Sequence, residues 1–253
     1  MNLFWTKKFK SFLAIVFLIL TWAGCSGSQE TPHPDPQTLA VYLSPVVPEQ
    51  VEQELFACFS RLDGLLPSVY TDFSPYPDLS AADVFLWWGD PAYYQALQEA
   101  DKIVYQVGEL EVGVLTHPRN PLEMIAISDL RAVFSGTVTQ WTDLTAQPPE
   151  SKIEVWVLPG NHPIQEVFER AVMTGLPITT TARIAPDLSG IQEMALEQEG
   201  LIGLTILDAA SQGKILSIQP SPEDLRQPLL LILPDSAPET YYPLVECLSS
   251  PEN

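Results

Sequence analysis

Short apolar runs rich in β-branched residues alternate with stretches of helical spacing along most of this chain. Residues 38–43, 83–88 and 153–158 each form such a run and end at serine, glycine or proline, which is typical of strands. After Pro48, apolar residues recur at the three-to-four-residue spacing of a helix. The run 153–158 is apolar at nearly every position, as in a parallel sheet covered on both faces. The alternation therefore predicts an α/β fold in which helices cover a sheet.

The same spacing rules give the remaining elements of the folded body. Further strands are expected at 68–73, 103–107, 110–116, 201–204, 215–218 and 229–233. Further helices are expected at 91–100, 129–134, 163–174, 190–199 and 238–248.

The first 24 residues are typical of an export signal. Three lysines among residues 1–10 precede the unbroken apolar run 12–20, and small residues follow it. The run is short for a membrane-spanning helix, which needs about 20 apolar residues. Residues 1–24 are therefore predicted to direct export and to be removed.

Ala23-Gly24-Cys25 resembles the lipobox of bacterial lipoproteins, in which the cysteine is lipidated and becomes the new N-terminus. The resemblance implies that Cys25 carries acyl chains, palmitate among them, which anchor the protein to a membrane. Plain secretion with cleavage near Cys25 is the alternative. Residues 25–37 have no apolar periodicity and contain three prolines, so they are predicted to form an extended tether.

Charge excludes one class of partner. Residues 1–24 hold three of the 12 basic residues and none of the 32 acidic ones, so the processed chain carries nine against 32. Such an acidic protein repels nucleic acid, and no basic patch interrupts it, so no nucleic-acid partner is expected.

The number and spacing of the cysteines and histidines limit the kinds of site that this chain can form. Cys58 and Cys247 fall in expected helices near the two ends of the body, and an oxidising compartment permits a disulfide between them. Free buried thiols are the alternative. With three histidines and no CxxC spacing, no metal site and no cofactor are expected. No pattern of a hydrolase, metalloprotease or phosphate loop occurs, so the chain is not predicted to be an enzyme.

One segment is specific to a family. Asn120-Pro121 is followed by a short amphipathic helix, expected at 129–134, and then by Ser-Gly-Thr-Val-Thr-Gln-Trp at 135–141. This segment resembles the phosphate-binding proteins of ABC importers, within the periplasmic-binding-protein-like superfamily. Gly136 supplies the positive φ that ends the helix, and Trp141 is expected to pack over the turn.

The resemblance implies a two-lobed α/β fold of the periplasmic-binding-protein type II with a central cleft. Residues 38–115 and 205–253 would form lobe 1, and residues 116–204 would form lobe 2. Ligands of such folds lie where strand ends and helix N-termini meet the cleft. The loops expected there are 44–47, 87–90, 159–162 and 187–190, and the candidate ligand-binding residues within them are Ser44, Val46, Trp88, Gly89, Asn161, His162 and Ser189.

The residues expected to clamp phosphate are replaced. The family's arginine position holds Leu158, and its Ser-Gly-Thr positions hold His162, Pro163 and Ile164. Losing several charge-assisted hydrogen bonds, at about 1.5–3 kcal/mol each, lowers phosphate affinity by orders of magnitude. Three alternatives stay open: another small molecule, weak phosphate binding through backbone N–H groups, or an empty cleft used for partner contact.

Individual candidates have plainer explanations as well. Trp88 either stacks on a ligand or packs in the core like any strand residue. His162, next to Pro163, contacts the cleft or occupies a surface turn. Asp90 is expected to cap the helix that begins at Pro91.

The sequence predicts a solute-binding lipoprotein that serves an ABC importer. The expected partners are a small-molecule or oxyanion ligand, an ABC permease, and a membrane reached through the lipid anchor. The expected location is the outer face of a bacterial membrane, in the periplasm or at the cell surface. The alternative is a sensory or structural lipoprotein on the same fold, without transport.

Overall fold

The computed structural model describes residues 37–62, 64–208, 212–236 and 238–249. The predicted export signal (1–24) and the tether as far as residue 36 lie outside the described residues, and so does Cys25. Among the described residues, no helix is both long enough and apolar enough to cross a membrane.

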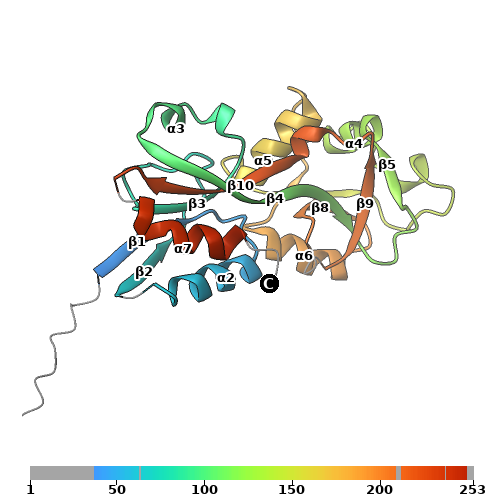
Figure 1. Ribbon diagram of the computed structural model, residues 1–253. Helices are drawn as coiled ribbons and strands as arrows, with labels where there is room; N and C mark the ends of the chain where they lie inside the picture. The colour runs from blue at the N-terminus through green and yellow to red at the C-terminus, as the bar shows by residue number, and fades with distance from the viewer. Residues whose placement is uncertain (1–36, 63, 209–211, 237, 250–253) are drawn as a thin grey trace, which may run out of the picture. The chain divides into compact units, whose positions relative to one another are not determined.

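A single mixed sheet organises the described chain (Figure 1). Its main path runs in the order β2-β1-β3-β10-β4-β8-β6-β7, with β5 and β9 attached beside β4. The strands are β1 (Gln37–Leu43), β2 (Leu65–Tyr70), β3 (Val84–Trp88), β4 (Lys102–Thr116), β5 (Met124–Ala126), β6 (Glu154–Val157), β7 (Arg183–Ile184), β8 (Leu201–Ile206), β9 (Lys214–Gln219) and β10 (Arg226–Pro234).

Strand β4 belongs to both halves of this sheet. Its first half pairs antiparallel with β10, and its second half, from Val112 onwards, pairs antiparallel with β8 and β9. The sequence predicts two strands here, at 103–107 and 110–116. The structure instead has one 15-residue strand with an irregular register opposite Leu229 and Leu230, so the break is a bulge within it.

Helices cover this sheet, as expected of an α/β fold. They are α2 (Glu49–Phe59), η1 (Pro91–Tyr93), α3 (Gln95–Glu99), α4 (Ile127–Phe134), η2 (Trp141–Asp143), α5 (Pro163–Phe168), η3 (Glu169–Met173), α6 (Leu188–Glu197), η4 (Glu223–Leu225) and α7 (Pro238–Ser249). Two expected helices are divided. The 91–100 helix breaks at Tyr94, and the 163–174 helix changes from α5 to the π-helix η3, which ends at Thr174 with φ +49°.

The two-lobed α/β fold is confirmed, with β4 shared between the lobes. We call β1–β3, β10, α2, α3 and α7 the first lobe, and β5–β9 and α4–α6 the second lobe. Strand β9 pairs with residues 114–116 of β4 and with β5. The boundaries at 115/116 and 204/205 stay a prediction.

A disulfide joins the two chain ends of the first lobe. Cys58 in α2 and Cys247 in α7 are bonded through their Sγ atoms at 2.07 Å, and their Cα atoms lie 5.8 Å apart. Both side chains are buried among the apolar residues between these helices and the sheet. The bond closes a loop of 189 residues within one lobe.

The family-like segment builds the core of the second lobe. Leu130, Val133 and Phe134 of α4 are all fully buried, and the Phe134 ring lies 4.6 Å from that of Phe168. Gly136 ends the helix with φ +81°, as predicted. Trp141 is buried as well. These residues stabilise the lobe.

Candidate functional site

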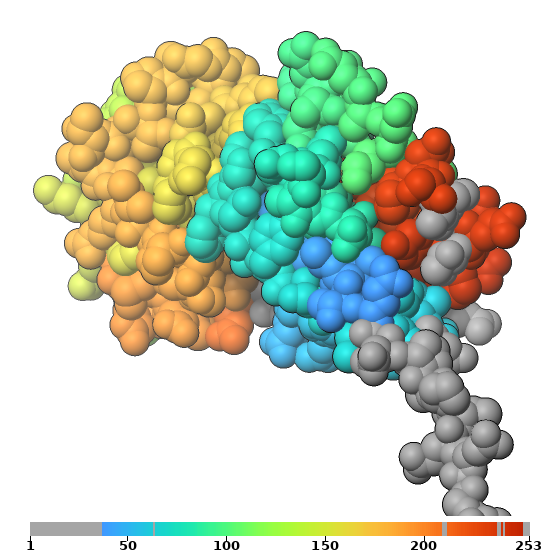
Figure 2. Space-filling view, turned by 90° about the vertical axis from the view of Figure 1, so that its left-hand side faces the viewer, coloured from blue at the N-terminus to red at the C-terminus, as the bar shows by residue number. Residues whose placement is uncertain are grey.

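The lobes meet along a surface that we call the seam (Figure 2). It consists of loop 71–83 and η1 from the first lobe, and of α5 and η3 from the second. Each side of the seam is connected to a strand of the sheet. Loop 71–83 leads into β3 in the first lobe, and α5 follows the loop after β6 in the second.

Three side chains spaced four residues apart in α5 and η3 each contact one aromatic residue of the first lobe. The His162 ring lies 5.8 Å from the ring of Phe73. Tyr76 donates a hydrogen bond of 2.6 Å from its hydroxyl to Oε1 of Glu166.

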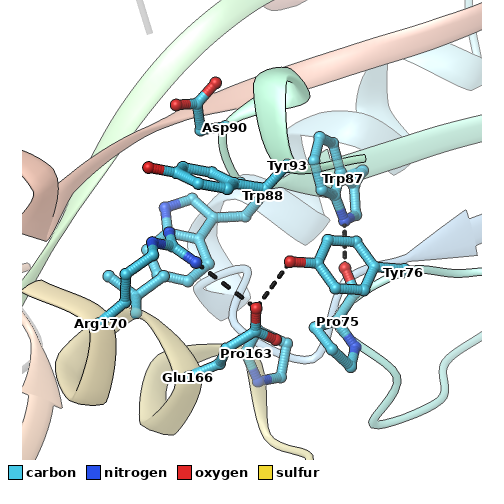
Figure 3. A pocket seen from close by; sticks show the side chains of 11 residues that line it. Pro75, Tyr76, Trp87, Trp88, Asp90, Tyr93, Pro163, Glu166 and Arg170 are labelled. Atoms are coloured by element: carbon cyan, nitrogen blue, oxygen red, sulfur yellow. Dashed lines mark hydrogen bonds and ion pairs between the residues drawn. The ribbon is translucent and has the colours of Figure 1, made fainter. Parts of the chain in front are cut away.

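The third contact completes this row. The Arg170 guanidinium lies over the Tyr93 ring, 4.0 Å from its centre, and Nη1 donates to Oε1 of Glu166 at 3.4 Å. Glu166 therefore accepts from both lobes at one oxygen, as Figure 3 shows. The row is a polar and aromatic joint between the lobes.

A small pocket opens at the seam (Figure 3). Its cavity volume is about 20 Å³, which is room for about one water molecule. The lobes therefore lie too close together here for a solute to fit. Its lining comes from both lobes: Pro75, Tyr76, Trp87, Trp88, Gly89, Asp90, Tyr93, Pro163, Glu166, Val167 and Arg170.

A guanidinium does reach the seam pocket, although not from the family's clamp position. Leu158, at the family's arginine position, is buried, and its N–H donates to Oε1 of Gln165. However, Arg170 lines the seam pocket from η3, 12 residues further along the chain. A helix face thus brings a guanidinium to the seam from a different point of the chain.

Trp88 is a core residue that also lines the pocket. It is 1% exposed, and its Nε1 donates to the carbonyl of Leu110 at 3.2 Å. Trp87 is equally buried and donates from Nε1 to Pro75 O at 2.9 Å, so it orders loop 71–83. Trp88 thus packs in the core, and its stacking on a ligand stays a prediction.

Gly89 is fixed at the pocket by its backbone. Its φ is +151°, and a Cβ there would lie 2.6 Å from the Trp87 ring, so no other residue fits without displacement. Its N–H donates to Pro228 O at 3.1 Å. The following residue, Asp90, accepts from Ala92 N at 2.8 Å and caps η1, as expected.

Ser44 and Val46 are buried between β1 and α2, and the lining of the seam pocket does not include them. The Ser44 N–H donates to Leu86 O at 2.9 Å, while its Oγ has no partner among the described residues.

Two acidic residues, Glu49 and Glu52, stand in the first turn of α2. They already satisfy the positive end of the helix dipole, as the sequence suggests.

His162 is a buried cap rather than a surface turn residue. It is 1% exposed, and its Nδ1 accepts from Ile164 N at 3.3 Å at the start of α5. Burial lowers the pKa of His162 to about 4, although the nearby carboxylate of Asp187 acts in the opposite direction. The ring is therefore neutral at physiological pH.

Ser189 and Asn161 are near the start of α6 and of α5, outside the seam pocket. Asp187 caps α6: its Oδ1 accepts from Gly190 N at 2.9 Å and from the Ser189 hydroxyl at 2.7 Å. These hydrogen bonds, that of Ser189 first, hold the pKa of Asp187 below its usual value. Ser189 and Asn161 are exposed, and neither is part of the pocket lining.

Of the seven candidates, the structure brings only Trp88 and Gly89 to the seam pocket. It adds four residues that sequence reasoning missed: Tyr76, Tyr93, Glu166 and Arg170. The four-residue spacing of His162, just before the expected helix 163–174, and of Glu166 and Arg170 within it is a usable signal, because such residues share a face. Nothing in the sequence indicated which aromatic residues that face would meet.

Comparison with known proteins gives the class. A family profile described as the PBP superfamily domain matches residues 99–246, more than half of the chain. The chain therefore belongs to the PBP superfamily, as the segment 120–144 suggested. No curated protein matches the sequence significantly.

Solved structures show the same fold at low identity. One, described as a phosphate ABC transporter substrate-binding protein with bound phosphate from Clostridium perfringens, has a TM-score of 0.70 and 13% identity, covering 85% of this chain and 94% of that one. An ABC-type phosphate transport receptor from Vibrio cholerae has a TM-score of 0.63 and 14% identity, covering 84% and 94%. The reduced OxyR regulatory domain from Pseudomonas aeruginosa has a TM-score of 0.56 and 12% identity, covering 84% and 97%. The fold thus resembles both transport and regulatory proteins.

Proposed function

We propose that this chain is an exported, lipid-anchored solute-binding protein that delivers a small molecule to an ABC permease. The observation that carries the proposal is that both lobes contribute side chains to one pocket at the seam. A binding protein captures its solute by closing two lobes around such a pocket, and the contacts across the seam hold them closed. A solute enters only when the lobes separate.

Two independent features support export. Residues 1–24 have the pattern of an export signal, and Cys25 lies where a lipobox cysteine lies. The Cys58–Cys247 disulfide is typical of proteins in an oxidising compartment, such as the space outside the bacterial inner membrane. The lipid anchor on Cys25 and the outer face of the membrane follow from the first feature.

The proposal is tested by a thermal-shift screen of the processed chain with oxyanions, sugars, amino acids and amines. A solute that binds the folded state raises the melting temperature by mass action. Tyr93→Leu removes a half-exposed ring from the pocket lining and is expected to abolish the shift. Tyr242→Leu is the matched control, since Tyr242 is similarly exposed but belongs to α7.

Two results would contradict a solute-binding role at the seam. One is a screen in which no solute raises the melting temperature. The other is a shift that Tyr93→Leu and Tyr242→Leu reduce equally, because the solute would then bind elsewhere.

A second candidate is a sensory or structural protein on the same fold. It is favoured by the cavity volume of about 20 Å³ at a seam that side chains already fill. In that case the closed form itself is the functional form, and a partner protein rather than a solute recognises it. The failure of the screen would favour this candidate.

A further inference from the structure

The seam pocket surrounds a cation that belongs to the chain itself. The Arg170 guanidinium lies 4.0 Å from the centre of the Tyr93 ring, a cation–π distance. Glu166 accepts from Nη1 at 3.4 Å, and Tyr76 holds the same carboxylate oxygen from the first lobe. We propose that this pocket is a site for organic cations, and that Arg170 occupies it as a tethered ligand that keeps the lobes closed.

The residue types of the pocket match a cation. Four aromatic side chains line it, and the negative faces of such rings attract guanidinium and ammonium groups. Two carboxylates, Glu166 and Asp90, line it together with a single basic group, Arg170. Phosphate entering here would meet an excess of negative charge, so a solute with a positively charged nitrogen is the ligand class that fits.

The position of Arg170 explains why the pocket has so little free volume. Its side chain crosses the seam from η3 in the second lobe, while the ring of Tyr93 belongs to η1 in the first. Its Nε is buried without a hydrogen-bond partner among the described residues, so the guanidinium is held here by the ring and by Glu166 rather than by a full set of hydrogen bonds. A tethered group has a local concentration of the order of millimolar, so a weak free cation does not displace it.

The inference shares one assumption with the proposed function, namely that ligands bind at the seam. Its test does not require the natural solute. Arg170→Ala empties the cage, and methylguanidinium is added as a replacement for the missing group. The unfolding midpoint of the variant is expected to fall by several degrees. Methylguanidinium at about 10–100 mM, the range expected for a few contacts, is expected to restore at least half of that loss.

Arg183→Ala is the matched control. Arg183 also lies near an aromatic ring, 5.6 Å from the centre of Trp156, and pairs with a carboxylate, Glu154, at 3.2 Å. Both of its partners belong to β6 in the second lobe, so Arg183 does not connect the two lobes. Methylguanidinium is expected to restore nothing in this variant or in the wild-type protein, and the neutral methylurea nothing in any of them.

Rescue of Arg170→Ala and Arg183→Ala to the same extent, or of neither, would overturn the cation site. If Arg170→Ala does not fold, Arg170→Met keeps the apolar stem without the charge. Hydrogen exchange of residues 73–76 and 91–93 is then expected to rise, and unchanged exchange would overturn the tethered-ligand role. The solute screen uses the wild-type chain, whereas the rescue experiment uses the Arg170 variants. A screen that finds no solute would therefore not change the outcome of the rescue experiment.

Discussion

Two places in this molecule join segments that lie far apart in the chain, and their chemistry differs. In the first lobe, α2 and α7 are joined by the buried Cys58–Cys247 disulfide, with apolar side chains around it. At the seam, the two lobes are joined by the Tyr76–Glu166 hydrogen bond and by contacts of the Tyr93 and Phe73 rings with Arg170 and His162. The first joint is covalent and lies within one lobe. The second is non-covalent, and the proposed function requires it to open and close while each lobe stays folded.

The disulfide is expected to contribute the largest effect on stability. Removing a crosslink that closes a 189-residue loop releases entropy in the unfolded chain worth up to about 5 kcal/mol. The Cys58→Ala, Cys247→Ala double variant should therefore unfold at much lower urea concentration than the wild type. The measurement is equilibrium urea unfolding of the processed chain under oxidising conditions.

Chemical reduction of the Cys58–Cys247 disulfide tests whether the disulfide and the seam are independent of each other. Dithiothreitol should lower the wild-type midpoint toward that of the double variant and leave the double variant unchanged. Hydrogen exchange at the seam should stay the same in both, because no sulfur takes part there. A seam that opens on reduction would show that the two joints are coupled.

The buried histidine at the seam predicts a smaller effect, which depends on pH. His162 has a pKa of about 4 in the folded chain against 6.5 in the unfolded one. The unfolded state therefore takes up the proton first, and stability falls as the pH drops from about 6.5 to 4. The 2.5-unit difference corresponds to a loss of up to about 3 kcal/mol, with no loss above pH 6.5.

Two variants separate this effect from other acid titrations. His162→Asn keeps an acceptor for the Ile164 N–H and should remove most of the slope between pH 6.5 and 4. Asp187→Asn keeps the cap of α6 but removes the charge that favours protonated His162, so it should steepen the slope. Urea unfolding at four pH values across this window measures both. Equal slopes in all three proteins would refute the assignment to His162.

The sequence predicted well what local pattern decides. The alternation of strands and helices, the closure of α4 by Gly136 and the burial of Trp141 all follow from spacing and residue type. The short strands β5 and β7 were missed, because two or three residues are too few to show a period. The strands expected at 103–107 and 110–116 are one strand, β4, because a bulge and a strand end look alike in one chain.

The seam could be predicted only in part, because it depends on how two lobes approach each other. Trp88 and Gly89 were found since they follow a strand that ends at the cleft. Tyr76 and Tyr93 belong to a loop and a short 3₁₀ turn, whose position comes from contacts such as that of Trp87 with Pro75. Arg170 was missed because a clamp was sought at one aligned position, whereas a neighbouring helix face supplies the guanidinium.

The smallest expected effect isolates a single hydrogen bond across the seam. Tyr76→Phe removes the hydroxyl that donates to Glu166, and burial together with this bond raises the pKa of Tyr76 to about 12. Because the bond joins two partly exposed groups, its loss should cost about 1 kcal/mol or less. Tyr93→Phe is the control, as it keeps the ring over Arg170 and should change stability by less. If urea unfolding shows the two variants to be equal while hydrogen exchange at 73–76 is unchanged, Glu166 does not join the lobes.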